Sequence, residues 1–257
     1  MQAVILAGGL GTRLSEETMN KPKPMVQVGG MPILWHIMKI YSSYGINEFI
    51  ICLGYKGYEI KEFFANYYLH SSDLLIDTEK NIIEVLNKKT ENWKINLIET
   101  GLDTMVGGRI KKIIPHLKEH ESFCLTYGDG LSNSNISMLI KAHNDSKKLV
   151  TMTAVNPPGR FGSIEFGKNG TLSFGEKKTE DNGWINGGFF VCSPKIDEYI
   201  DGNQTVWEKE PLQNLIKDNE LNIFKHNGFW QPMDTLRDKT LLDELWLKDN
   251  PPWKTWE

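Results

Sequence analysis

The sequence predicts an α/β fold whose mostly parallel, mixed β-sheet is flanked by helices. Through the first two-thirds of the chain, short apolar runs typical of buried strands alternate with amphipathic stretches typical of helices. After about residue 156, glycine and proline become denser and the runs become short and alternating. Strands that alternate with helices pair in parallel through right-handed crossovers. We therefore expect a parallel core that antiparallel or mixed strands extend after residue 156.

The expected elements follow from where each run begins and ends. Residues 32–44 illustrate how a helix is identified. Ile33, Ile37 and Ile40 recur at the spacing that places them on one face of a helix. Strands are expected at residues 2–6, 48–53, 94–99, 122–127, 149–155, 162–166, 170–174 and 185–191. Helices are expected at residues 32–44, 58–68, 107–117, 134–145, 207–218 and 235–248. Residues 73–93 fit either a β-hairpin or a helix. One domain with an accessory lobe is the simplest arrangement, since no linker or repeat interrupts the chain.

Composition limits the partners and the location. The formal charge is −4, whereas nucleic-acid-binding domains usually show a strong basic excess. No segment approaches the roughly 20 apolar residues that a spanning helix needs. We therefore expect no nucleic acid and no membrane as partners. Cys52, Cys124 and Cys192 are far apart and lie in apolar runs, which favours buried thiols and a cytoplasmic location.

The loop after the first strand carries the strongest chemical signal. Residues 8–13 read Gly-Gly-Leu-Gly-Thr-Arg, and Lys23 follows between two prolines. Glycines at the carboxyl end of a strand let a ligand approach the backbone, whose N–H groups can cradle phosphate oxygens. Arg13 offers a planar fork for phosphate, and Lys23 offers a point charge on a stiffened backbone. A tight glycine turn with surface cations is the plainer alternative.

Other phosphate-binding glycine motifs fit less well. A P-loop requires a lysine directly after its glycines, and none follows here. The dinucleotide fingerprint GxGxxG lacks its third glycine, because Leu14 occupies that position. The pattern therefore favours a different kind of phosphate site.

Residues 3–34 resemble the start of the sugar-nucleotide pyrophosphorylases, whose pattern is GGxGTRL followed by PKPM. The resemblance covers nearly the whole chain, with the motifs in family order. It implies one Rossmann-like nucleotidyltransferase domain over residues 1–257, with a nucleotide-binding core at about 1–156. A small β-rich sugar-binding lobe and the C-terminal part would occupy about 157–257. Arg13 and Lys23 would be catalytic, and the expected triphosphate-binding residues of this region are Leu6, Ala7, Gly8, Gly9, Leu10, Gly11, Thr12, Arg13 and Lys23.

Two aspartates are candidate metal ligands. Asp129 follows an apolar strand between two glycines, and Asp234 precedes an expected helix. Taken alone, Asp129 fits an Asp-Gly turn equally well, and Asp234 fits a helix N-cap. Mg²⁺ takes one or two protein carboxylates and completes its shell with water and phosphate oxygens. The YGDG and FWQPMDTLRD segments resemble the metal-binding segments of the family, which implies a Mg²⁺ site at Asp129 and Asp234.

Residues 99–109 discriminate between nucleotides. The hydroxyl of Thr104 and nearby backbone amides could read the edge of a pyrimidine, although Thr104 also fits a helix cap. The TG…TMVGGR pattern resembles the cytidylyltransferases of this family that use glucose 1-phosphate. The QPxGLA-like sequence that is usual in the thymidylyltransferases is absent. The resemblance therefore implies CTP as the nucleotide, with Thr104, Arg109 and Gly128 as contacts.

Three later segments resemble those that surround the sugar, namely residues 159–162, 174–178 and 185–191. One departure is Lys178, which stands where the family has proline. Glu208 and Glu210 resemble a further sugar-side segment, or they form a surface acidic pair. The residues implied as contacts of glucose 1-phosphate are Glu176, Lys177, Asn186 and Gly187.

The implied reaction is attack by the sugar phosphate on the α-phosphorus of CTP, which yields CDP-glucose and pyrophosphate. The attacking phosphate is already anionic, so catalysis needs positioning and charge neutralisation rather than a general base. The resemblance also implies a homo-oligomer, a hexamer, with residues 73–93 as the candidate interface. It further implies a supply of activated glucose for surface polysaccharide such as O antigen. Three alternatives stay open: an enzyme that uses dTTP or UTP, a non-catalytic sugar-nucleotide sensor and, with least support, a nicotinamide oxidoreductase.

Overall fold

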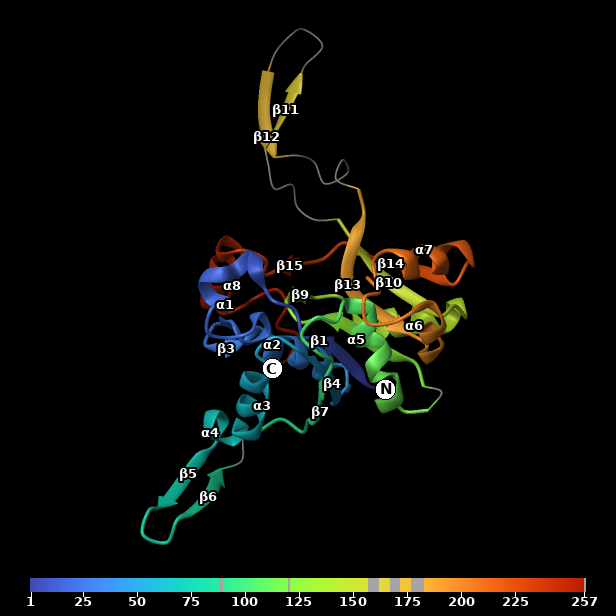
Figure 1. The fold of residues 1–257 in the computed structure, drawn as a ribbon. Coiled ribbons are helices and arrows are strands. Elements are labelled where there is room, and N and C mark those ends of the chain that lie inside the picture. Colours follow the sequence, from blue (N-terminus) through green and yellow to red (C-terminus); the bar gives the residue numbers. More distant parts are fainter. Residues whose placement is uncertain (88–89, 120, 157–161, 167–171, 177–182, 257) are drawn as a thin grey trace.

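A seven-stranded mixed sheet forms the centre of the protein in the order β14-β10-β13-β8-β1-β4-β7 (Figure 1). The structure is a computed structural model that describes residues 1–87, 90–119, 121–156, 162–166, 172–176 and 183–256. The strands of this sheet are β1 (Ala3–Leu6), β4 (Glu48–Leu53), β7 (Lys94–Glu99), β8 (Phe123–Tyr127), β10 (Val150–Val155), β13 (Ile185–Cys192) and β14 (Leu221–His226).

The pairing of the strands is mostly parallel. Strand β1 runs parallel to β4 and β8, β4 to β7, and β10 to β14. Strand β13 is antiparallel to its neighbours β8 and β10. The expected mixed, mostly parallel sheet is therefore confirmed, and β13 is the strand that makes it mixed.

Helices cover both faces of the sheet, as the continuously apolar strands require. Along β1, Ala3 and Ile5 belong to one buried core, and Val4 and Leu6 belong to the other. The first core contains side chains of α2 (Ile33–Ser43), α3 (Gly57–Ala65), α6 (Ile136–Ser146) and α8 (Leu236–Leu247). The second contains side chains of α5 (Val106–Ile113) and α7 (Glu210–Lys217).

Several helices differ from the expected ranges for local reasons. The helix expected at 58–68 is broken at Asn66, which separates α3 from α4 (Tyr67–Ser71). The helix expected at 107–117 becomes a 3-10 turn at Ile114, directly before Pro115, whose ring removes an N–H donor. The helix expected at 207–218 begins only at Glu210, while Trp207 is fully buried in the second core.

The segments after residue 156 are only partly as expected. Strands β11 (Gly162–Phe166) and β12 (Leu172–Glu176) pair with each other and form a separate two-stranded sheet. The prediction that they extend the main sheet is therefore wrong, whereas β13 does join it. Residues 170 and 171 of the expected strand lie outside the described residues. Strand β14 was not anticipated from the sequence.

Residues 73–93 contain a β-hairpin, which settles the choice between hairpin and helix. Strands β5 (Asp73–Asp77) and β6 (Ile82–Asn87) pair antiparallel and extend away from the sheet (Figure 1). All three cysteines are buried free thiols, as expected, and burial raises the pKa of Cys52 and Cys124 to about 12. None of the helices within the described ranges has the length and hydropathy that crossing a membrane requires.

Candidate active site

A cavity of about 860 Å³ opens at the carboxyl ends of β1 and β8. In an open α/β sheet this edge is where ligands bind. The cavity brings together every residue that the sequence suggested for the nucleotide and for the metal. These residues are Leu6, Ala7, Gly8, Gly9, Leu10, Gly11, Thr12, Arg13, Lys23, Thr104, Arg109, Gly128, Asp129 and Asp234.

The glycine loop after β1 needs glycine at two positions for different reasons. Gly11 has φ +65°, in the left-handed region that other residues rarely adopt. A Cβ atom on Gly8 would lie 2.1 Å from Nη1 of Arg109, so a side chain there would collide with the guanidinium. The loop then continues into the 3-10 turn Thr12–Leu14 and the short helix α1 (Ser15–Thr18). This path leaves the side chain of Arg13 largely exposed at the mouth of the cavity.

Arg109 lies beneath this loop and ties it to the loop that follows β7. Its Nη2 donates to the carbonyl of Gly8 at 2.9 Å, and its Nη1 donates to Thr100 Oγ1 at 2.6 Å and to the carbonyl of Gly101 at 2.8 Å. Burial lowers the pKa of Arg109. Among the contacts that the structure describes, the guanidinium meets neutral oxygens and no carboxylate. Its positive charge therefore adds to the field of the cavity.

Lys23 stands at the centre of an ion cluster on the other side of the loop. Its ammonium group lies 2.5 Å from Oδ2 of Asp129 and 2.8 Å from Oδ1 of Asp234. The guanidinium of Arg13 lies 2.8 Å from the other oxygen of Asp234. Lys23 is only 8% exposed, so this cation is largely removed from water and needs such partners. The cluster balances two cations with two carboxylates.

A small antiparallel pair of strands brings the two aspartates together. In β9 (Gly130–Ser132) and β15 (Trp230–Pro232), Gly130 lies opposite Pro232. One step further along, the N–H of Met233 donates to the carbonyl of Asp129 at 2.8 Å. Asp129 and Asp234 are therefore neighbours because this register places the end of β8 beside the start of α8.

Asp238 fixes the backbone that carries Asp234, and the sequence reasoning missed it. Thr235 is the N-cap of α8, and Thr235 and Asp238 form a capping box. Oδ2 of Asp238 accepts the N–H of Asp234 at 3.1 Å and the N–H of Thr235 at 2.9 Å. The alternative that Asp234 is itself the cap is therefore wrong. The signal was present in the sequence as Thr-Leu-Arg-Asp, a cap residue followed three positions later by an acid.

The two aspartates fit a divalent cation. Both carboxylates approach one point, because both accept a hydrogen bond from the same nitrogen atom of Lys23. No cluster of three or more His, Cys, Asp or Glu side chains suited to a metal occurs in the described part of the chain. The site therefore matches a metal that takes one or two carboxylates and fills its shell with water and substrate phosphate, as Mg²⁺ does.

Three further hydrogen-bonding side chains line the cavity: Tyr127, Asn186 and Glu208. Nδ2 of Asn186 donates to the hydroxyl of Tyr127 at 3.2 Å, and that hydroxyl donates to the carboxylate of Glu208. Oδ1 of Asn186 accepts the N–H of Gly188 at 2.8 Å, which fixes the orientation of the amide. Burial and the nearby carboxylate of Glu208 raise the pKa of Tyr127, so its hydroxyl stays protonated. Together the carboxylate of Glu208 and the neutral side chains of Tyr127 and Asn186 offer donors and acceptors suited to hydroxyl groups.

The expected sugar-side residues are only partly brought together. Asn186 lines the cavity, and Gly187 lines a small adjoining pocket together with Asp129. Glu176 belongs to the separate hairpin β11–β12, where Gly162 is its partner. Lys177 lies outside the described residues. Tyr127 was not expected near the sugar, and Glu208 was expected there only as an alternative to a surface acidic pair. The structure places both beside Asn186.

The cavity, the glycine loop and the cluster of cations and carboxylates define a phosphate-handling enzyme, and comparison with known proteins agrees. The nucleotidyl transferase family model matches residues 2–231, so this chain belongs to that family. It is 54% identical to the glucose-1-phosphate cytidylyltransferase of Salmonella typhimurium, over all of both chains. It is 45% identical to the probable glucose-1-phosphate cytidylyltransferase of Bacillus subtilis, again over all of both chains.

Solved structures extend the comparison to the fold. HddC from Yersinia pseudotuberculosis is 25% identical with a TM-score of 0.69, covering 95% of this chain and 99% of that one. The UDP-glucose pyrophosphorylase of Acinetobacter baumannii shares the fold at 15% identity, with a TM-score of 0.70 over 98% of this chain and 95% of that one. Enzymes of this family generally use a divalent metal. The family match ends before Asp234, so the second candidate ligand rests on the geometry of the site.

Proposed function

We propose that this protein is an enzyme that joins glucose 1-phosphate to CTP, with CDP-glucose and pyrophosphate as products. The observation that carries the proposal is the cluster of Lys23, Arg13, Asp129 and Asp234 at the glycine loop. Its cations and carboxylates suit the transfer of a nucleotidyl group between phosphates. The identity of 54% along the full length of a glucose-1-phosphate cytidylyltransferase supports these substrates.

Mg²⁺ is the proposed metal, with Asp129 and Asp234 as its protein ligands. Two carboxylates and two cations leave the cluster without excess charge, and a bound triphosphate adds several negative charges. A divalent cation held by Asp129 and Asp234 would offset this added charge. The ammonium of Lys23 would then be available to the phosphates.

Different residues of the chain would bind the leaving group and the attacking group. Backbone N–H groups of the glycine loop would bind the triphosphate, and Arg13 would draw charge from the departing pyrophosphate. Lys23 would neutralise the α-phosphate and the incoming sugar phosphate as they approach. The sugar phosphate is already an anion, so no residue has to remove a proton before it attacks.

Recognition of the base and recognition of the sugar are assigned to different residues of the cavity wall. Thr104, Arg109 and Gly128 would contact or position the nucleotide, since all three line the cavity beside the glycine loop. Asn186 and Gly187 would hold the sugar, and Glu176 and Lys177 complete the proposed set. Residues 1–257 would work as one nucleotidyltransferase domain, with a core at about 1–156 and a sugar-binding and C-terminal part at about 157–257.

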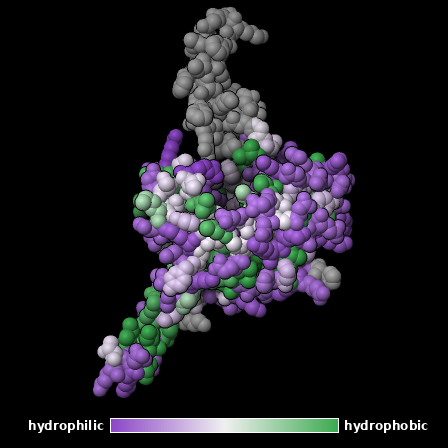
Figure 2. Space-filling view, viewed as in Figure 1, coloured by the Kyte–Doolittle hydropathy of each residue, from purple (hydrophilic) through white to green (hydrophobic). Residues whose placement is uncertain are grey.

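We also propose that the protein is a homo-oligomer, a hexamer, joined through the hairpin β5–β6. Cross-strand pairing places Leu74 opposite Val85 and Ile76 opposite Ile83. These four side chains share one face, because residues two apart on a strand point the same way. Ile76 is 59% and Ile83 52% exposed, and the space-filling view shows apolar surface gathered along this arm (Figure 2). A continuous apolar face on a projecting hairpin is typical of an interaction surface.

The proposed setting is the cytoplasm, where the product would supply activated glucose for surface polysaccharide such as O antigen. The three free, buried cysteines support a reducing compartment.

The test of the function is pyrophosphate release from glucose 1-phosphate and Mg²⁺ with CTP, dTTP, UTP or ATP supplied separately. Release with CTP far above the others is expected. Release with dTTP or UTP instead would keep the reaction and overturn the assignment of the base. Folded protein that binds CTP and releases no pyrophosphate with any of the four would favour the sugar-nucleotide sensor.

A further inference from the structure

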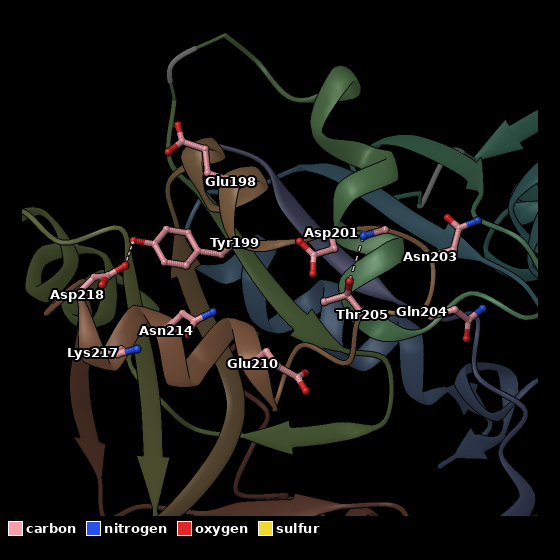
Figure 3. Close-up of a pocket in the computed structure, with 11 residues that line it drawn as sticks. Glu198, Tyr199, Asp201, Asn203, Gln204, Thr205, Glu210, Asn214, Lys217 and Asp218 are labelled. Carbon is pink, nitrogen blue, oxygen red and sulfur yellow. Dashed lines mark hydrogen bonds between the residues drawn. The ribbon is translucent and has the colours of Figure 1, made fainter.

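Residues 202–205 help to line a second cavity, of about 880 Å³ (Figure 3). The second cavity is lined by residues from the 3-10 turn Pro194–Tyr199, from this loop and from α7. Gln204 lines both cavities, so the loop also borders the active-site cavity.

The loop caps helix α5, whose first residue, Val106, lines the active-site cavity. Met105, the N-cap residue directly before this helix, provides no side-chain hydrogen bond to the free N–H groups of the first turn. Instead, the N–H of Met105 donates to the carbonyl of Asn203 at 2.8 Å. The N–H of Gly107 donates to the carbonyl of Thr205 at 2.9 Å. Backbone carbonyls of the loop therefore replace a capping side chain.

A side chain of the same loop reaches the segment that leads into α5. Nε2 of Gln204 donates to the carbonyl of Asp103 at 3.1 Å. The loop is itself closed, because the N–H of Gly202 donates to Oγ1 of Thr205 at 3.1 Å (Figure 3). The segment around Thr104 is thus held by a turn that has its own internal hydrogen bond.

Close packing at two glycines brings α5 against the loop. A Cβ atom on Gly107 would lie 2.7 Å from the carbonyl oxygen of Thr205. A Cβ atom on Gly108 would lie 2.6 Å from Cα of Asn203. Both obstacles are backbone atoms, so a side chain at either glycine would push α5 and the loop apart.

We infer that residues 203–205 position the nucleotide-reading segment around Thr104, and that Gln204 is a positioning residue for nucleotide binding and base selectivity. The inference rests on the proposed function, because it assigns the segment at Thr104 to the base. Loosening the loop lets this segment shift and weakens the contacts that distinguish one base from another. The cluster at Lys23 lies elsewhere in the cavity and keeps its own support from β9 and β15.

The test compares Gly107→Ala with Gly202→Ala by equilibrium binding of CTP and of UTP in the presence of Mg²⁺. Gly107 does not line the active-site cavity, so its effect has to pass through the loop and the helix. A Cβ atom on Gly202 meets nothing within 4 Å, which makes the same substitution on the loop a matched control. We expect Gly107→Ala to bind CTP about ten-fold more weakly and to lose preference over UTP, corresponding to about 1.4 kcal/mol. Gly202→Ala should bind both nucleotides like the wild type.

A second variant guards against a folding defect in Gly107→Ala. Gln204 is exposed, and Gln204→Met keeps its length while removing the N–H that donates to Asp103. The loss of one neutral hydrogen bond should weaken CTP binding about three- to ten-fold. The KM for CTP should rise while kcat at saturating CTP stays near that of the wild type.

The outcomes separate this inference from the proposed function. Unchanged CTP binding and unchanged preference over UTP in both Gly107→Ala and Gln204→Met, with the proteins folded, would overturn the positioning role. A fall in kcat with an unchanged KM would also overturn it. Failure of the wild type to turn over CTP would instead contradict the function, and the binding comparison would still be readable.

Discussion

Lys23 and Asp234 are 211 residues apart in the chain, and the ammonium of one lies 2.8 Å from a carboxylate oxygen of the other. The same ammonium lies 2.5 Å from Asp129. The cation proposed to neutralise the reacting phosphates therefore occupies the region between the two proposed metal ligands. Binding of a metal and of the triphosphate would exchange these partners, so Lys23 turns from the carboxylates to the phosphates.

Lys23→Ala should reduce turnover by about two to three decades. The substitution removes one preorganised positive group from the reacting phosphates, and losses of this size follow the removal of one such donor. Pyrophosphate release at saturating substrates measures the change. Lys21→Ala is the matched control, because Lys21 precedes the same Pro-Lys-Pro turn and does not line the cavity. Normal turnover by a folded Lys23→Ala protein would remove Lys23 from the reaction.

Asp129→Asn should weaken the response of the activity to Mg²⁺. The amide keeps the shape of the side chain and removes the negative charge that holds the metal, so more Mg²⁺ is needed for half-maximal rate. A Mg²⁺ titration at fixed CTP measures this shift. Asp201→Asn serves as the control, since Asp201 is exposed and lines the second cavity instead. A titration curve that coincides with that of the wild type would exclude Asp129 as a ligand.

Local sequence patterns predicted most of the residues that line the cavity. The features that the sequence did not predict depend mainly on pairing between distant segments. The glycine loop and Lys23 lie close together in the sequence, so their chemistry was readable from residue types and spacing. The mutual approach of Asp129 and Asp234 depends on the register of β9 with β15, which no local pattern reveals. Likewise, the alternation in β11 and β12 predicted strands correctly but not which sheet they join. Asp238 was missed although its capping box is a local signal.

Asp238→Asn should destabilise α8 and misplace Asp234. Asp238 accepts the backbone N–H of Asp234 and of Thr235, and an amide substitutes a weaker neutral acceptor for the carboxylate. We expect a loss of about 1 kcal/mol in the free energy of unfolding, as for other caps. The requirement for Mg²⁺ should also rise, measured by the same titration. Asp243→Asn, on the same helix, is the comparison, and an equal effect of the two substitutions on the Mg²⁺ requirement would contradict this role.

A charge on the apolar face of the hairpin should dissociate the proposed oligomer. Ile76→Asp places a carboxylate opposite Ile83, and burying it in an interface costs more than the contact gains. Sedimentation should then show smaller species than the wild type. Glu84→Ala changes the opposite face, where Glu84 pairs with Leu75, and should leave the assembly intact. A wild type that sediments as a monomer would refute the oligomer itself.

His36 should make the protein less stable as the pH falls from about 6.5 to 4. Burial lowers its pKa from 6.5 to about 4, and both nitrogens of the neutral ring form hydrogen bonds. One nitrogen bonds to the carbonyl of Val28 at 2.8 Å, and the other accepts from the indole of Trp253 at 3.4 Å. Between these pH values His36 is protonated in the unfolded chain and neutral in the folded chain. The contribution of His36 to the free energy of unfolding is therefore full above pH 6.5 and decreases below it.

The size of this effect follows from the lowered pKa. The difference between 6.5 and about 4 corresponds to roughly 3 kcal/mol of unfolding free energy, lost progressively as the pH falls. Denaturant unfolding of the wild type and of His36→Gln at several pH values isolates the contribution, because glutamine keeps a donor for Val28 and does not titrate. The wild type should lose stability more steeply than His36→Gln over this range. If the stability of the two proteins instead changed equally with pH, the pKa of His36 would be the same in the folded and unfolded states, and the prediction would be wrong.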